Sequence, residues 1–363
     1  LSSTISTLTN TGTISGSVTG SGLDAFDIKN DGVITTFNNQ QTGLTYSGTL
    51  PVNYNIIINS PTDYGSTIFS NATGTTNFGL DTVNSTSGLG GYYSDILSGI
   101  GGANIVSTIG NSGDQYWVIL DSDSDNTFDL NLSYAGNQSI TSDISYTQNG
   151  AYGFWMKEND NSTISINADI TTTGSDAFGF YSDSSDSNNI TVTGDINTSG
   201  ADANAVYIST SNYNRSIIIT GDISTSGQGA SGIYQVSSNE NTTVITGDIS
   251  TTGQQASGIY QEVADSNTTS VNGNISTTGQ QAPGIFTSNA DNNTFVINGN
   301  IITAGTDDNS KPIFISNSDS NTFNLSGNVQ SLGGDQAISI DANSDDNTFY
   351  IYSGAIFLGD FEN

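Results

Sequence analysis

The sequence predicts an all-β fold, a right-handed parallel β-helix built from coils of 26–28 residues. Three observations lead to this prediction. A short motif returns at that period from about residue 140 to the end, apolar and polar residues alternate on both sides of it, and glycine recurs at fixed positions. A fixed period of this size is typical of stacked supersecondary units, each of which contacts only its neighbours.

The recurring motif is Gly-Asp-Ile or a close variant, followed by a second glycine six residues after the first. Glycine that recurs in one place marks a corner where the backbone has positive φ or approaches another segment closely. The motifs are Ser142-Asp143-Ile144, Ala168-Asp169-Ile170, Gly194-Asp195-Ile196, Gly221-Asp222-Ile223, Gly247-Asp248-Ile249, Gly273-Asn274-Ile275, Gly299-Asn300-Ile301, Gly327-Asn328-Val329 and Gly354-Ala355-Ile356.

Each coil is expected to contain three short strands. In the coil around Gly299, Phe295, Ile297, Ile301 and Thr303 alternate with more polar neighbours, as in strands with one buried face. A third apolar segment follows the second glycine, and a turn rich in Asp, Asn and Ser leads to the next coil. Asparagine returns in this turn and predicts a ladder of stacked amides, at Asn188, Asn241, Asn267, Asn293 and Asn321.

Three regions are expected along the chain. Residues 1–43 carry a looser version of the pattern and predict short N-terminal β-helix coils. Residues 44–132 lose the period, and their apolar runs are broken by Gly, Pro and Asn, which favours an irregular β-rich module. Residues 133–363 predict the regular parallel β-helix.

The composition excludes several classes of partner. The formal net charge is −31, from 35 acidic and four basic residues, so neither nucleic acid nor an anionic membrane surface is an expected partner. Cysteine and histidine are absent, which excludes a disulfide framework and thiolate or imidazole metal sites, and no cofactor is expected. No apolar run is long enough for a transmembrane helix. The first residue is Leu1, which we interpret as the start of a mature or trimmed product.

Several segments resemble the passenger regions of bacterial autotransporter (type V secretion) proteins. They are the runs ITTFNN, LTYSGTLPVNYNIIINS and YWVILDSDSDNTFDL, together with the later coils of the form TGDISTTG and ASGIY. The resemblance implies export through an outer-membrane barrel and a position at the bacterial cell surface or outside the cell.

One candidate metal site stands out. Asp121, Asp123 and Asp125 alternate with serine, and alternate carboxylates in a loop are one way in which proteins collect oxygen ligands for Ca²⁺. Asn126 stands where such loops usually have glycine, and no bidentate glutamate follows. The run is therefore either a calcium site or a solvated turn.

Catalysis is not expected from the sequence. The repeated aspartates Asp143, Asp169, Asp195, Asp222 and Asp248 occur coil after coil, and a residue present in each coil serves the coil itself. Without histidine and with few basic residues, the sequence shows no general base or charge clamp, so we expect that the protein is not an enzyme.

An aromatic column runs through the third segment of the coils, at Tyr181, Tyr207, Tyr234, Tyr260, Phe286 and Phe314. Two interpretations stay open. The rings form either an exposed stripe that stacks against carbohydrate or a structural stack between neighbouring coils.

Two non-catalytic functions are expected from these features. The first is a surface-displayed adhesin or rigid spacer that contacts cell-surface carbohydrate or protein. The alternative is a self-assembling subunit of an extracellular filament, sheath or surface layer, joined to copies of itself through open strand edges at the β-helix ends. Candidate self-association residues are apolar and lie near the C-terminus, at Tyr350, Ile351, Ile356, Phe357 and Leu358.

Overall fold

The fold is described from a computed structural model. It describes residues 4–14, 26–121, 127–333, 336–358 and 360–362. The chain divides into two compact units, Leu1–Ala135 and Gly136–Asn363, which are considered one at a time.

The first unit contains two main sheets. Within its described residues, one sheet has four parallel strands, β1 (Thr4–Asn10), β3 (Val33–Asn39), β5 (Asn53–Ile56) and β9 (Asn77–Leu80). The other follows the order β11 (Ile109–Ser112), β12 (Gln115–Leu120), β13 (Thr127–Leu132), β10 (Gly91–Ser98), β8 (Thr67–Thr73), β4 (Leu44–Thr49) and β2 (Ile28–Asn30).

Strand direction changes along this second sheet. The pairs from β2 to β10 are parallel, whereas β10, β13, β12 and β11 pair in antiparallel fashion. A hairpin of β6 (Ile58–Ser60) and β7 (Asp63–Tyr64) and a 3₁₀ turn, η1 (Gly102–Asn104), complete the unit. Its core combines Ile and Leu with an aromatic cluster, because Phe37, Tyr46, Tyr54, Phe69 and Phe78 are buried in successive ring contacts.

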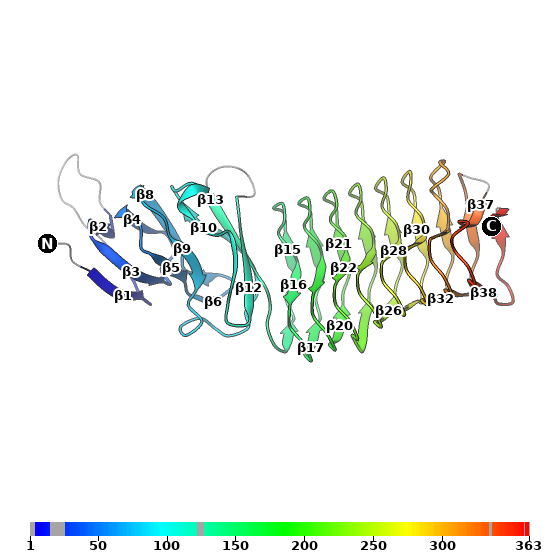
Figure 1. Cartoon of the computed structure of the whole chain (residues 1–363), viewed down its shortest axis with the longest axis horizontal. Helices are drawn as coiled ribbons and strands as arrows, with labels where there is room; N and C mark the ends of the chain where they lie inside the picture. Colours follow the sequence, from blue (N-terminus) through cyan, green and yellow to red (C-terminus); the bar gives the residue numbers. More distant parts are fainter. Residues whose placement is uncertain (1–3, 15–25, 122–126, 334–335, 359, 363) are drawn as a thin grey trace. The chain divides into compact units, whose positions relative to one another are not determined.

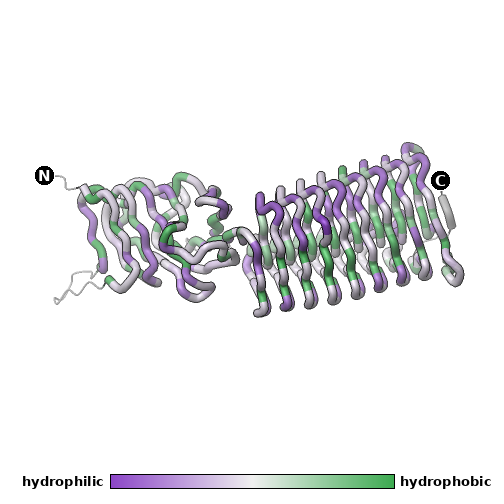
Figure 2. The backbone as a smooth tube through the Cα atoms, turned by 90° about the horizontal axis from the view of Figure 1, so that it is seen from below, coloured by the Kyte–Doolittle hydropathy of each residue, from purple (hydrophilic) through white to green (hydrophobic). Residues whose placement is uncertain are grey.

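The second unit is a parallel β-helix, as the repeat predicts. Figure 1 shows its coils stacked as a regular series from β15 (Ile144–Tyr146) to β38 (Thr348–Ile351). In the described part of the unit, each coil contributes one strand to each of three parallel sheets. The tube in Figure 2 shows hydrophilic and hydrophobic segments returning from coil to coil.

The strands of the three sheets are as follows. The first sheet contains β14 (Gln138–Ile140), β17 (Thr163–Ile166), β20 (Asn189–Thr193), β23 (Ser216–Thr220), β26 (Thr242–Thr246), β29 (Thr268–Val271), β32 (Thr294–Ile297), β35 (Thr322–Leu325) and β38. The second contains β15, β18 (Ile170–Thr172), β21 (Ile196–Thr198), β24 (Ile223–Thr225), β27 (Ile249–Thr251), β30 (Ile275–Thr277), β33 (Ile301–Thr303), β36 (Val329–Ser331) and β39 (Phe357–Leu358). The third contains β16 (Phe154–Lys157), β19 (Phe180–Asp183), β22 (Val206–Ser209), β25 (Ile233–Val236), β28 (Ile259–Glu262), β31 (Ile285–Ser288), β34 (Ile313–Ser316), β37 (Gln336–Ile340) and β40 (Asp360–Glu362).

Identical residues stack on identical residues inside the coils. Ile249, Ile275 and Ile301 occupy consecutive places in the second sheet, and all three are fully buried. The buried threonine at the end of these strands is satisfied within its own coil, because Thr251 Oγ1 donates to the carbonyl of Ala256 at 2.6 Å. The alternation seen in the sequence therefore places apolar side chains and short, hydrogen-bonded polar ones inside.

Close approach of the preceding coil requires glycine in both columns, and part of the motif column also has an unusual backbone conformation. At the motif, Gly194, Gly221 and Gly247 have φ near +150°, a conformation that side chains rarely adopt. In the second column the backbone φ is not positive, and close approach is what requires glycine there. A Cβ on Gly253 would lie 2.5 Å from the carbonyl carbon of Gly227 in the preceding coil.

Polar ladders hold the corners together. The backbone N–H of Asp195 donates to Asp169 Oδ1 at 2.9 Å, and this contact repeats along the aspartate column. The asparagine ladder forms by a similar route in the opposite direction, since the N–H of Asn241 donates to Asn267 Oδ1 at 2.9 Å. Side chains bond to the neighbouring backbone here, rather than amide to amide.

Candidate functional site

The outer face of the third sheet carries a continuous row of aromatic side chains. They occupy the second position of successive strands, and strand register places each beside the next. Trp155 is buried and the others are half-buried. We call this the aromatic row: Trp155, Tyr181, Tyr207, Tyr234, Tyr260, Phe286 and Phe314.

The rings of the aromatic row stack on one another. Centroid separations from Tyr181 to Phe314 run from 4.7 to 5.3 Å, with interplanar angles of 4 to 23°. Stacking covers much of each ring face, so ring edges and phenolic hydroxyls remain on the surface. The structure therefore supports the structural stack between neighbouring coils, and stacking against carbohydrate stays a prediction.

A second outward row lies two residues further along the same strands. We call it the flanking row: Lys157, Asp183, Ser209, Val236, Glu262, Ser288 and Ser316. The two carboxylates of the flanking row have side-chain partners on this face. Tyr234 donates its hydroxyl hydrogen to Glu262, and Lys157 forms an ion pair with Asp183.

Acid–base groups gather at the β16 end of the aromatic row. Tyr152 stacks on Phe178 with centroids 5.4 Å apart and meets Tyr181 edge-on at 5.2 Å. We call Tyr152, Lys157, Phe178, Tyr181 and Asp183 the β16–β19 cluster. A lysine, a carboxylate and two phenols in one place provide proton donors, a proton acceptor and a positive charge.

The phenols of this face are proton donors at neutral pH. The pKa of Tyr152 is raised to about 12, mainly by burial and further by the nearby charges of Asp176 and Asp183. Burial and then Glu262 raise the pKa of Tyr260 to about 12 as well. The pKa values of Tyr181, Tyr207 and Tyr234 are also raised, again mainly by burial.

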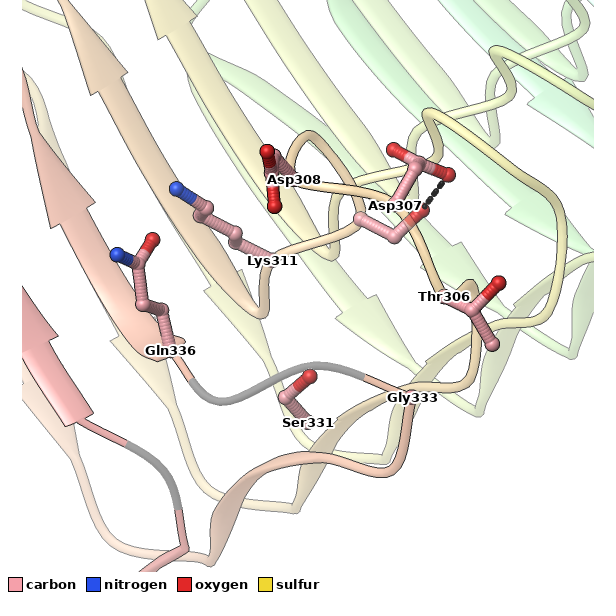
Figure 3. A pocket seen from close by; sticks show the side chains of 8 residues that line it. Thr306, Asp307, Asp308, Lys311, Ser331, Gly333 and Gln336 are labelled. Carbon is pink, nitrogen blue, oxygen red and sulfur yellow. Dashed lines mark hydrogen bonds between the residues drawn. The ribbon is translucent and has the colours of Figure 1, made fainter.

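A polar cavity lies near the other end of the aromatic row. Its volume is about 290 Å³, and it is lined by Thr306, Asp307, Asp308, Ser310, Lys311, Ser331, Gly333 and Gln336. Figure 3 shows these side chains and the hydrogen bond from Ser310 to Asp307. Lys311 connects the cavity to the row, because its Nζ lies 5.7 Å from the ring centre of Phe314.

Asp307 is fixed by backbone and side-chain donors. It accepts from the N–H groups of Gln281 and Asn309 and from Ser310 Oγ, at 2.7 to 2.9 Å. Burial acts to raise its pKa, but these hydrogen bonds outweigh burial, and the net effect is a lowered pKa. The cavity lining therefore presents two carboxylates, an amide, hydroxyls and one ammonium group, all of which can form hydrogen bonds with a polar ligand.

The sites predicted from sequence lie elsewhere. Asp121 is exposed, while Asp123 and Asp125 fall outside the described residues, so the calcium site stays a prediction. Among the residues that the structure describes, no three acidic side chains are grouped so as to hold a metal ion. Tyr350, Ile351, Ile356 and Leu358 are about half exposed, and Phe357 is partly buried. Nothing tests their role in self-association.

Sequence reasoning found the aromatic column but missed Asp183, Glu262 and Lys157. Each of these appears in one coil only, so no repeat draws attention to it. The available signal was position, since each follows an aromatic residue of the column by two places and must share its outward face. No helix in the described ranges is long and apolar enough to cross a membrane.

Comparison with known proteins identifies fold similarity and no family. No protein-family model matches the chain, and no curated protein matches it. The chain is similar to a solved structure from Azotobacter vinelandii, the A-module of the mannuronan C-5 epimerase AlgE4. The TM-score is 0.40 and the sequence identity 12%, over 92% of this chain and 90% of that one.

This comparison contradicts two expectations drawn from the sequence, that the chain is not an enzyme and that it is a non-catalytic adhesin, spacer or self-assembling subunit. The similar structure is a module of an enzyme. The earlier reasoning treated missing histidine as missing acid–base chemistry, whereas the β16–β19 cluster supplies a phenol, a carboxylate and a lysine without it. At this level of similarity the comparison assigns no activity to this chain.

Proposed function

We propose that residues 136–363 bind an extended, uncharged polysaccharide along the outer face of the third sheet. The observation that carries this proposal is the aromatic row, whose phenols repeat at 4.7 to 5.3 Å from Tyr181 to Tyr260 beside the flanking row. Phenols both donate and accept hydrogen bonds, as sugar hydroxyls do, and Glu262 adds a strong acceptor.

The spacing of the row favours a glycan over a peptide. An extended peptide presents side chains of one face at about 6.7 Å, twice the rise per residue of a strand, which does not match a coil spacing of about 4.8 Å. A linear glycan instead presents hydroxyl groups along both edges of its chain. The cavity at Lys311 extends this surface with further polar groups of the same kind.

Charge selects the kind of glycan. With 35 acidic residues against four basic ones, the net charge of −31 repels a polyanion over distances comparable to the Debye length. On the face itself, Lys157 is already paired with Asp183. An uncharged polysaccharide meets neither repulsion nor competition for that lysine.

The second candidate function is chemistry on the bound glycan at the β16–β19 cluster. Its support is that two phenols with raised pKa values, Tyr152 and Tyr181, lie beside the Lys157–Asp183 ion pair, and perturbed pKa values are more frequent at functional sites than elsewhere. Tyr181 is the proton donor in this proposal and Asp183 the acceptor, with Lys157 holding the carboxylate in place.

We further propose that the protein is passenger-like and acts outside the cell. This rests on the resemblance of its N-terminal runs and coils to autotransporter passenger regions and on the absence of cysteine. Fractionation of the producing cells, with protease added to intact cells, tests the location. Protection of the chain from external protease would refute it.

Binding is tested by affinity electrophoresis in gels that contain uncharged polysaccharides of different linkage. Retardation is expected with one or more of them. Tyr234→Phe should weaken it about fivefold, the value of one neutral hydrogen bond of about 1 kcal/mol. Tyr213→Phe is the matched control, because Tyr213 is 55% exposed and lies between β22 and β23, outside the strands of the third sheet. No retardation in any gel, or equal loss in both variants, would refute the proposal.

Chemistry is tested on the polysaccharide that binds. Its chain length and proton NMR spectrum are compared before and after incubation with the protein. Turnover that is lost in Asp183→Asn while retardation persists supports the second candidate. An unchanged polysaccharide, or equal turnover in that variant, would refute it without affecting the binding proposal.

A further inference from the structure

We propose that Tyr234 and Tyr260 form an oxidative cross-linking site. A one-electron oxidant would join the two rings through a bond between carbons ortho to their hydroxyls, and so link the coils of β25 and β28 covalently. This modification is independent of any glycan on the same face.

Ring geometry singles out this pair. Tyr234 and Tyr260 are register partners on adjacent strands, and their centroids lie 4.7 Å apart with an interplanar angle of 4°. The other tyrosine pairs of the aromatic row are further apart and more inclined. The values are 5.3 Å and 23° for Tyr207 with Tyr234, and 5.0 Å and 15° for Tyr181 with Tyr207. Both rings of the proposed pair are half-buried, so the ring edges reach solvent.

A shared carboxylate makes these two phenols the easier ones to oxidise. Loss of an electron makes a phenol strongly acidic, and a hydrogen-bonded carboxylate takes up the proton as the electron leaves. Tyr234 donates to Glu262, and Tyr260 interacts with the same carboxylate. Asp183, beside Tyr181, is a weaker proton acceptor because it is paired with Lys157. Tyr207 is hydrogen-bonded to Ser209 and not to a carboxylate.

The aromatic row also conducts oxidation toward this pair. Rings from Trp155 to Tyr260 are in contact, with centroid separations of 4.7 to 6.4 Å, so an electron vacancy formed on any of them can pass to its neighbour. Beyond Tyr260 the row continues with Phe286 and Phe314, which have no hydroxyl proton to release. Migration therefore ends at Tyr260.

The reaction balances as a two-electron oxidation. Each phenol gives one electron to the oxidant and one proton to Glu262 or water, which leaves two tyrosyl radicals. Their ortho carbons form one carbon–carbon bond. The two hydrogens on those carbons then move to the phenoxyl oxygens, which restores both phenols. The net loss is two hydrogen atoms, and two one-electron oxidant equivalents, such as the two that persulfate provides on becoming sulfate, are reduced.

The test uses the full chain at low concentration, illuminated with ruthenium tris-bipyridyl and persulfate. The monomer is expected to lose the mass of two hydrogen atoms and gain dityrosine fluorescence, and peptide mapping should join the peptides of Tyr234 and Tyr260. Tyr260→Phe should abolish the monomeric product. Phenylalanine is tolerated in this row, as Phe286 and Phe314 show, so the fold is expected to be retained and circular dichroism checks this.

Two further variants separate the site from general oxidation. Glu262→Gln should lower the yield several-fold while keeping the stack, and Tyr213→Phe, which alters an exposed tyrosine off the row, should leave the yield unchanged. A monomeric product that persists in Tyr260→Phe, a cross-link mapped to other tyrosines, or a yield in Glu262→Gln equal to that of the wild type would overturn the proposal.

Discussion

Replacing Gly253 with alanine tests how tightly the coils approach one another. The new Cβ would lie 2.5 Å from the carbonyl carbon of Gly227 and 3.1 Å from the nitrogen of Gln228, and nearer still to the Gly227 oxygen. Ordinary carbon–carbon contacts are about 3.5–4.0 Å, so the contact with the carbonyl carbon alone requires the two coils to separate by about 1 Å or more.

The cost follows from what this separation strains. Overpacking of this kind costs about 1–3 kcal/mol, and the nearby bond from Thr252 N–H to the Thr225 carbonyl, now 3.0 Å, would lengthen and lose about 1 kcal/mol more. We expect Gly253→Ala to lower the free energy of unfolding by about 3 kcal/mol. Hydrogen exchange should show lost protection in β24 and β27, the paired strands that lead into the strained corner.

Two controls make the result specific. Thr252→Ala changes an exposed neighbour, and Gly102→Ala adds a Cβ that meets nothing within 4 Å. Both should lie within about 0.5 kcal/mol of the wild type by urea denaturation. If Gly253→Ala matches these controls in both urea midpoint and exchange, then close approach is not the reason for this glycine column.

Three further predictions concern buried hydrogen bonds and titration. Thr251→Val should cost about 1–3 kcal/mol in urea denaturation, because the Ala256 carbonyl then loses its buried donor, and an unchanged midpoint would contradict this. Burial raises the pKa of Tyr152 to about 12, so the folded state favours the neutral phenol. The contribution of Tyr152 to the free energy of unfolding is therefore complete below pH 10 and is lost as the pH rises toward 12, about 3 kcal/mol in all. Urea midpoints over that range should fall less steeply in Tyr152→Phe, and equal slopes would argue against it. The pKa of Asp341 is lowered because hydrogen bonds, including those from Ser316 and Asn317, outweigh burial. The contribution of the Asp341 carboxylate to stability is therefore present above pH 3.8 and fades as the pH falls below that value. Asp341→Asn should remove this acid-dependent loss of exchange protection at Asn317.

Periodicity explains why the β-helix could be predicted. Residues such as Ile275 and Ile301 occupy equivalent places, so their positions predict both the strand and its partner one coil away. The strands of residues 44–132 offer no such rule. Nothing in the run around Tyr93 indicates that β10 pairs in parallel with β8 on one side and in antiparallel fashion with β13 on the other. These pairings depend on long-range packing of the core.

The candidate site was predictable only where it repeats. The column of Tyr207, Tyr234 and Tyr260 was visible as a period, and the structure shows it as one stack. Glu262 occurs once, and its importance comes from a tyrosine in the preceding coil. The cavity at Lys311 arises in a coil that is two residues longer than the coil before it, and side-chain placement in such a loop depends on contacts that a repeat does not encode.

The corner ladders have a consequence for how such a chain changes over generations. The aspartate column receives N–H groups from the following coil, and the asparagine column receives them from the preceding coil. Each coil thus forms the same ladder hydrogen bonds with the coil before it and the coil after it. A gene duplication or deletion that begins and ends at equivalent positions, such as Asp222 and Asp248, would leave each bond of these ladders replaced in kind. Coil number is therefore free to vary by recombination at such positions, and both ladders also continue through coils of 26, 27 and 28 residues.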